Sequence, residues 1–170
     1  KLVSSGHVNS GVMSILTANS RDPLERIGDF EAQMSANRVG ATRLHDLVNR
    51  HGLDQMSEHS IALLDYARRM TETIILRIPD GEYAFEDGLE GDGQSDALVP
   101  IRVVVRKHGS SMIVDLTQSS PQVMGNINTV KAVAQSATWY CVRLLADLDL
   151  PVNDGCFSPI EVIVSEGTVL

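Results

Sequence analysis

Apolar residues recur at helical spacing along two long segments in the first half of the chain. In the first segment, Asp22 can cap a helix whose first residue is Pro23, and His51-Gly52 is a typical helix end. The apolar positions between them are Leu24, Ile27, Met34, Ala41, Leu44 and Val48. We therefore predict a helix of about 28 residues, roughly 40 Å long.

A second helix is predicted from about Ser57 to Arg77, with Ser57 as its cap and Pro79-Asp80-Gly81 as the turn after it. Its apolar face comprises Ile61, Leu64, Ala67, Thr71, Ile74 and Ile78. Leu53 to Met56 is interpreted as a short connection, so that the two helices form an antiparallel pair over about residues 22–78.

The second half of the chain shows the two-residue alternation typical of β-strands. Two alternating runs flank His108-Gly109, which predicts a hairpin. The apolar positions are Ile101, Val103 and Val105 before the turn and Met112, Val114 and Leu116 after it. Tyr83–Phe85 is predicted as a short strand, and Pro159–Val164 as a last one.

A third helix is predicted over Val130–Ala146, capped by Asn128 or Thr129. The positions expected to face inward are Val133, Ala137, Tyr140, Cys141, Leu144 and Leu145. The whole pattern predicts an α+β fold in which long antiparallel helices pack on a small, mainly antiparallel sheet. Residues 1–170 are treated as one domain, with the hairpin, third helix and last strand over about 98–165.

Two stripes with a four-residue repeat run along the first long helix. Gly28, Ala32, Ala36 and Gly40 form a ridge of small residues that would let another backbone approach closely. The neighbouring stripe is polar: Asp29, Gln33 and Asn37. It is either a solvent-exposed face, or a hydrogen-bonded seam or ligand-facing edge.

A polar loop rich in Ser, Gln and Asn, residues 115–128, lies directly ahead of the third helix. Its amides include Asn126 and Asn128, and the helix start adds unpaired N–H groups with positive partial charge. Such a loop could hold an anion, for example a phosphorylated intermediate or a carboxylate. The alternative is a structural loop held by its own hydrogen bonds.

Composition narrows the class of protein. The formal net charge of -8 argues against nucleic acid and anionic membranes as partners. No apolar run approaches the ~18 residues of a membrane helix. The acidic stretch 80–96 lacks the spacing of a calcium loop and is interpreted as a solvent loop.

The sequence contains only two cysteines, Cys141 and Cys156, which favours a reducing, cytoplasmic compartment. Cys141 is expected to be a buried, inert thiol.

The five histidines show no metal-binding spacing, so no metal ligand is predicted in this sequence. The chain begins at Lys1 without Met and stops at Val169-Leu170. Both ends resemble cuts through a longer chain, and we expect an internal piece of a larger subunit.

Ordered landmarks resemble the hydantoinase B/oxoprolinase family. The first are Asn19-Ser20-Arg21-Asp22-Pro23, Gly28-Asp29-Phe30-Glu31-Ala32-Gln33, Gly40, Arg43-Leu44, Pro79-Asp80-Gly81 with Tyr83, and Asp92-Gly93. Downstream follow Val114-Asp115-Leu116-Thr117, Ser119-Ser120-Pro121-Gln122, Gly125-Asn126-Ile127-Asn128, Pro151-Val152-Asn153 with Gly155, and Glu166-Gly167. Gln118 departs from the glycine, and Ser165 from the proline, that this family often has there.

The resemblance implies part of an ATP-dependent amidohydrolase subunit that opens cyclic amides of the hydantoin or 5-oxoproline type. An A-type partner would use ATP to phosphorylate the substrate oxygen, and this B-type subunit would complete the hydrolysis. ATP and a divalent metal are implied for the full hetero-oligomer, whereas this segment contains no cofactor site and is not active alone. Asp29, Gln33, Asn126 and Asn128 fall on family-like positions and are the candidate substrate-binding residues.

Two alternatives remain open. The same family includes the larger subunits of ATP-dependent acetone and acetophenone carboxylases, so the resemblance also allows a ketone carboxylase. The second alternative is a scaffold or assembly module without catalytic residues, which the ridge of small residues would suit.

Overall fold

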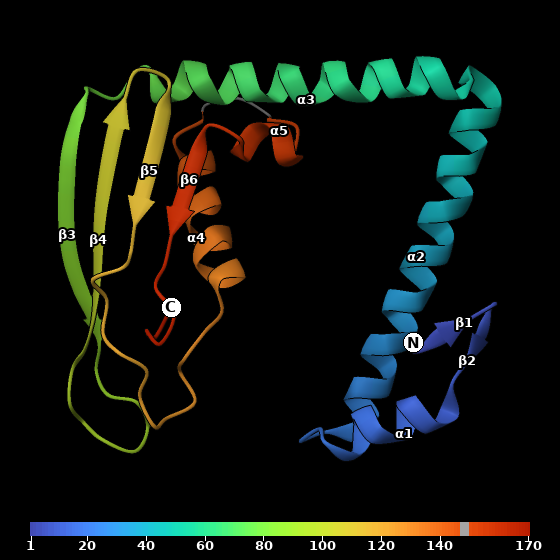
Figure 1. Cartoon of the computed structure of the whole chain (residues 1–170), viewed down its shortest axis with the longest axis horizontal. Helices are drawn as coiled ribbons and strands as arrows, with labels where there is room; N and C mark the ends of the chain where they lie inside the picture. The colour runs from blue at the N-terminus through green and yellow to red at the C-terminus, as the bar shows by residue number, and fades with distance from the viewer. Residues whose placement is uncertain (147–149) are drawn as a thin grey trace. The chain divides into compact units, whose positions relative to one another are not determined.

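The computed structural model describes residues 1–146 and 150–170, which divide into two compact units, 1–58 and 59–170. Helices and a four-stranded, mostly antiparallel sheet make this an α+β fold, as predicted (Figure 1).

The first unit is mainly helical. Strands β1 (Val3–Ser4) and β2 (His7–Val8) form a small antiparallel hairpin, and α1 (Ser10–Ala18) follows. The long helix α2 (Pro23–His51) has the predicted ends: the Asp22 carboxylate accepts a hydrogen bond from the backbone N–H of Glu25 (3.1 Å), and Gly52 follows the last turn.

Helix α3 (Leu53–Ile75) begins earlier than predicted. The connection over Leu53–Met56 and the cap at Ser57 are wrong, because Gly52 alone makes the turn. Its φ of +80° is a conformation that glycine adopts readily. The Gly52 carbonyl oxygen then accepts a hydrogen bond from the N–H of Met56 (3.2 Å), which starts the next helix.

The second unit contains the four-stranded sheet. Its strands are β3 (Gly81–Leu89), β4 (Val99–His108), β5 (Ser111–Asp115) and β6 (Ile160–Ile163), in that spatial order. The first two pairings are antiparallel and β5–β6 is parallel. The predicted hairpin is confirmed, with its turn at Gly109 (φ +56°). β3 is much longer than the predicted Tyr83–Phe85, because all nine of its residues pair with β4.

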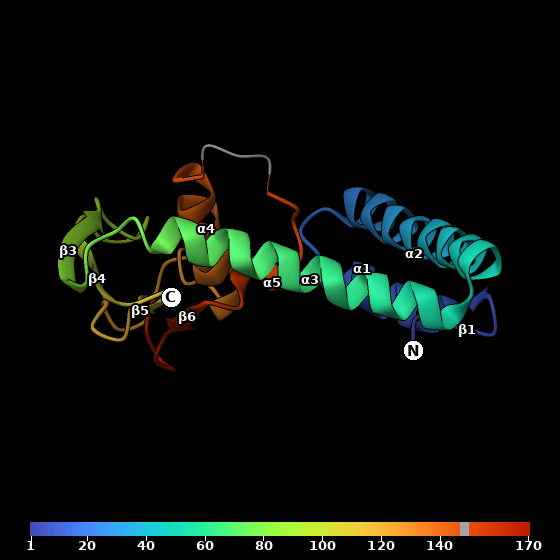
Figure 2. The same ribbon diagram turned by 90° about the horizontal axis from the view of Figure 1, so that it is seen from above.

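Helix α4 (Lys131–Leu144) lies beside β6, and the short α5 (Asp154–Phe157) precedes that strand (Figures 1 and 2). The core of the unit gathers the buried side chains of both layers and the end of α3: Ile75, Met112, Val114, Leu116, Ala134, Val142, Ile160 and Val162. The rings of Trp139 and Phe157 stack at a centroid distance of 4.1 Å.

The predicted inward face of α4 is wrong, because all six residues predicted to face inward are exposed. Its buried residues are Ala134 and Val142, whereas the larger apolar side chains predicted to face inward are exposed: Val133, Tyr140, Leu144 and Leu145. Cys141 is exposed as well. Among the bulky residues of α4, Trp139 packs against the core, whereas Tyr140 and Leu144 are exposed.

Candidate functional site

Loops at one end of the sheet bring together segments that are far apart in sequence, and Asp92 links two of them. Its Oδ1 accepts hydrogen bonds from the backbone N–H groups of Gln94 (2.9 Å) and Ser95 (2.7 Å), and its Oδ2 accepts one from Gly125 (2.9 Å). The side chain is buried, with 6% of the residue exposed. The amides of Gln94, Gly125 and Ser95 lower the pKa of the Asp92 carboxyl, because they stabilise its charged form.

This contact requires glycine at position 125. A Cβ atom there would lie 1.8 Å from the carbonyl oxygen of Asp92, far inside van der Waals contact. The backbone approach that the Asp92–Gly125 hydrogen bond needs is therefore possible only without a side chain.

Asn128 holds the same loop from the other side. Its Oδ1 accepts a hydrogen bond from the N–H of Val123 (2.9 Å), and its Nδ2 donates to the carbonyl oxygens of Val123 (2.8 Å) and Gly125 (3.2 Å). The predicted cap at Asn128 or Thr129 is wrong, and the Asn128 amide is already bound to the loop. The cap of α4 is Val130, which makes no side-chain capping bond. The neighbouring Asn126 is exposed.

The end of the chain pairs with this loop. Val169 donates its N–H to the carbonyl oxygen of Ser120 (2.9 Å), Gln122 donates to Gly167 (2.9 Å), and Thr129 donates to Val169 (2.9 Å). These bonds explain why three of the landmarks, Ser119–Gln122, Gly125–Asn128 and Glu166-Gly167, meet in space although up to 47 positions separate them.

Polar side chains fasten this cluster to β4 and link β4 to β5. Ser119 is buried, and its hydroxyl accepts a hydrogen bond from the N–H of Arg102 (3.1 Å) and donates one to the Arg102 carbonyl oxygen (3.2 Å). Asp115 accepts hydrogen bonds from the Thr117 hydroxyl (2.6 Å) and N–H (3.0 Å), and from the Arg106 guanidinium (2.9 Å). The Thr117 hydroxyl first, and then Arg106, lowers the pKa of Asp115 to about 2.

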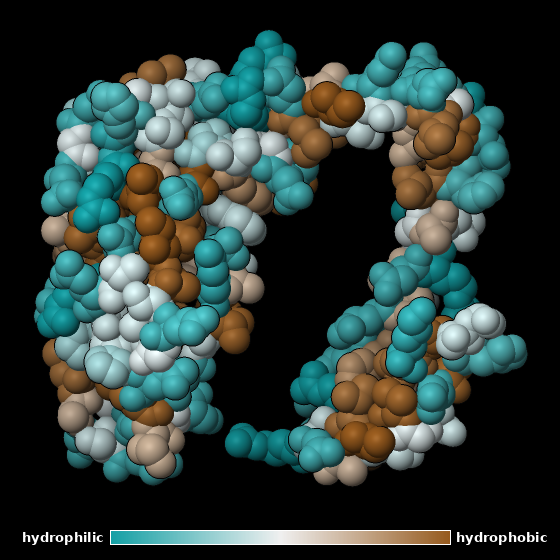
Figure 3. All heavy atoms as spheres, viewed as in Figure 1, coloured by the Kyte–Doolittle hydropathy of each residue, from teal (hydrophilic) through white to brown (hydrophobic). Residues whose placement is uncertain are grey.

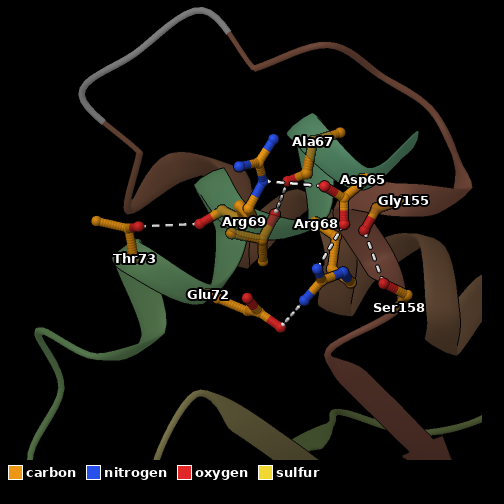
Figure 4. Close-up of polar contacts among 9 residues, drawn as sticks. Asp65, Ala67, Arg68, Arg69, Glu72, Thr73, Gly155 and Ser158 are labelled. Carbon is orange, nitrogen blue, oxygen red and sulfur yellow. Dashed lines mark hydrogen bonds and ion pairs between the residues drawn. The ribbon is translucent and has the colours of Figure 1, made fainter. Parts of the chain in front are cut away.

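A hollow of about 360 Å³ lies between α3 and α5. Its cation, Arg68, is held between the carboxylates of Asp65 and Glu72, each at 2.5 Å (Figure 4). The positive charge of Arg68 and the negative charges of its two partners all belong to α3. The hollow therefore attracts an incoming anion only weakly. A Cβ atom on Gly155 would lie 2.0 Å from the carbonyl oxygen of Leu64, which shows how tightly α5 packs here.

The predicted site residues fall in different units. Asp29 and Gln33 lie one turn apart on α2, where Asp29 forms an exposed ion pair with Arg26 (2.7 Å). Along their stripe, Gln33 and Asn37 are exposed and Asp29 is half-buried. Asn126 and Asn128 share the loop described above. Their role in binding substrate stays a prediction.

Sequence reasoning missed Asp92, because it treated the whole acidic stretch as solvent-exposed. A usable signal was present in Gly91-Asp92-Gly93, since an Asp between glycines is typical of a turn in which the carboxylate binds nearby backbone N–H groups. Both glycines have positive φ, +107° and +84°.

The residues described do not fit the divalent metal implied for the complete enzyme. Over residues 1–146 and 150–170, no three His, Cys, Asp or Glu side chains are grouped so that they could hold a metal ion. In the same part of the chain, every helix is too short or too polar to span a bilayer.

Comparison with known proteins identifies the family. Residues 1–170 match the hydantoinase B/oxoprolinase family along their whole length. The chain belongs to this family. It is 32% identical to the B subunit of a putative D-/L-hydantoinase from Pseudomonas sp. (strain NS671), over 99% of this chain and 30% of that protein. It is 29% identical to the 5-oxoprolinase of Saccharomyces cerevisiae, over 90% of this chain and 12% of that protein.

The fold is also that of a solved relative. The crystal structure of the ATP-dependent caprolactamase from Pseudomonas jessenii matches 99% of this chain and 29% of its own chain, with a TM-score of 0.84 and 28% identity. This hydantoinase B/oxoprolinase segment therefore spans less than a third of the length of these relatives. One relative is the B subunit of its hydantoinase, and another is the beta subunit of the caprolactamase from Pseudomonas jessenii, so both are parts of multi-subunit enzymes.

Proposed function

We propose that this chain is a structural part of the B-type subunit of an ATP-dependent cyclic amide hydrolase. The observation that carries the proposal is the match of 99% of the chain, at a TM-score of 0.84, to an ATP-dependent caprolactamase. The similarity to the B-type subunit of a hydantoinase and to a 5-oxoprolinase points to the same substrate class, since all three names refer to ring amides.

A cyclic amide resists water because resonance between nitrogen and carbonyl stabilises it. ATP-dependent activation of the carbonyl would overcome this resistance, and an A-type partner subunit would supply the nucleotide site. A divalent metal would likewise be held by other parts of the assembly. In this proposal the 170 residues position and enclose the substrate, and they are inactive alone.

Within the chain, the loop at residues 119–128 is the part best suited to face a substrate. Its backbone is fixed by Asp92, Asn128 and the 166–169 segment, so an exposed side chain on it would be presented in a defined position. Asn126 is such a side chain, with one donor and one acceptor group for a ring amide. Asp29 and Gln33 on α2 are the second pair of candidates.

The test of the reaction is an assay of the full-length subunit with its A-type partner. We expect ATP-dependent ring opening of hydantoin, 5-oxoproline or caprolactam. A parallel assay with a ketone and bicarbonate measures the carboxylase alternative. ATP-dependent consumption of the ketone without ring opening would contradict the proposed reaction, and no turnover of any substrate would favour a scaffold.

The test of the site compares two asparagines of one loop. Asn126→Ala is expected to lower turnover of the assembled enzyme while its melting temperature stays unchanged, because the side chain is exposed. Asn128→Ala is the matched control, and it should lower the melting temperature, because three loop hydrogen bonds are lost. Normal activity of Asn126→Ala and Asp29→Ala at a normal melting temperature would rule out a site role for both.

A further inference from the structure

The inner face of the sheet carries an apolar groove beside α4. A cavity of about 410 Å³ opens there, between β4 and β5 on one side and the helix on the other. Six of its lining residues define it: Ile101, Val103, Val105, Ala137, Cys141 and Leu170. Its walls are nearly all apolar, so water gains few hydrogen bonds in it.

The uncovered apolar surface continues from the groove onto β3. Tyr83 and Phe85 pair in register with Val105 and Val103, so their side chains lie on the same face as the groove. Phe85 is 68% exposed and Tyr83 44%. A continuous apolar patch of this kind is rare on a free protein surface and marks an interaction site.

The dimensions of the sheet indicate how much of its inner face α4 leaves uncovered. Strands lie about 4.8 Å apart and a packed helix occupies roughly 10 Å, so one helix covers about two strands. α4 contacts β6, and its buried Ala134 and Val142 share the core with residues of β5 and β6. The inner face over β3 and β4 therefore has room for one more helix, parallel or antiparallel to α4.

We propose that this groove receives an amphipathic helix from another part of the same subunit polypeptide. The caprolactamase chain contains this fold within 29% of its length, so most of that polypeptide is available to pack on it. A segment of the same polypeptide needs no separate association step, because its effective concentration near the groove is high.

The reactivity of the Cys141 thiol measures whether the groove is occupied. Its thiol is exposed at the groove, whereas Cys156 is buried at 2% exposure. In the full-length subunit without its A-type partner, we expect maleimide to label Cys141 about 10-fold or more slowly than in the same protein unfolded in urea. Mass spectrometry of the peptide that contains Cys141 measures both rates.

A matched pair of substitutions on β3 identifies the covered face. Phe85→Ser removes an apolar contact to the helix and should speed the labelling of Cys141 in the full-length subunit. Ala84→Ser introduces the same residue one position away, on the opposite face of the strand beside Val104, and should leave the rate unchanged.

Three results would overturn the proposal. The first is labelling of native Cys141 as fast as in the unfolded protein, which would show an open groove. The second is protection that depends on protein concentration, which would show a second copy of the chain. The third is protection that develops only when the A-type subunit is added, which would assign the groove to that partner.

Discussion

The two units differ in what happens to their apolar side chains. In residues 59–170, Ile75 is fully buried, and it shares a core with side chains from β5, β6 and α4. In residues 1–58, all of them described, α1 and α2 contain no buried residue, and Leu24 is 82% exposed. Figure 3 shows apolar side chains at the surface over α1 and the start of α2.

This contrast separates what forms a helix from what stabilises it. α2 has its cap at Asp22, proline at its first position and Gly52 at its end, so local sequence specifies where it starts and stops. Most helical stability in proteins comes from packing of an apolar face. Within residues 1–58, α2 contacts α1, but neither helix contains a buried residue. We expect its apolar face to be covered in the full-length subunit.

The largest expected effect comes from shortening one apolar side chain in each unit, which tests the contrast between them. Ile75→Ala should destabilise residues 59–170 by about 2–5 kcal/mol, since it removes a fully buried side chain. Leu44→Ala on α2 should change stability by less than about 0.5 kcal/mol in the 170-residue chain, because Leu44 is 52% exposed. Urea unfolding followed by circular dichroism measures both, and equal costs would contradict the contrast.

Replacing one glycine in each unit by alanine tests the same contrast between the two units. Gly125→Ala should cost about 1–3 kcal/mol, because the new Cβ would meet the Asp92 carbonyl oxygen and force the loop apart. Gly40→Ala meets no atom within 4 Å and should stabilise α2 by up to about 1 kcal/mol. Melting curves of the two variants test this. A neutral Gly125→Ala would show that the loop yields easily.

The smallest expected effect concerns the charge on Asp115. Its pKa of about 2 lies below the unfolded value of 3.8, so its stabilising contribution is complete above about pH 4 and is lost as the pH falls through 2. Asp115→Asn should therefore cost about 1–2 kcal/mol at pH 7, and the difference from the unchanged protein should shrink near pH 2.

A neighbouring carboxylate provides the control for this charge. Glu82 also pairs with Arg106, but its side chain is 62% exposed. Glu82→Gln should cost less than about 0.5 kcal/mol at pH 7. Urea midpoints at pH 7 and at pH 2.5 (a value within the ~2–4 window of the Asp115 titration) compare the three proteins. A cost for Asp115→Asn that does not change with pH would contradict its assignment to charge.

The sequence by itself determined the family, the α+β class, the ends of α2 and the central hairpin. These follow from ordered motifs, helix caps and the two-residue alternation, all of which act between residues near one another in the chain. Only the tertiary structure decided that Asp92 binds Gly125, that Asn128 binds its own loop instead of capping α4, and that α4 buries Ala134 and Val142 instead of its larger residues. Those outcomes depend on which backbone amides and which sheet face come within reach after folding, and no local pattern specifies such contacts across distant segments.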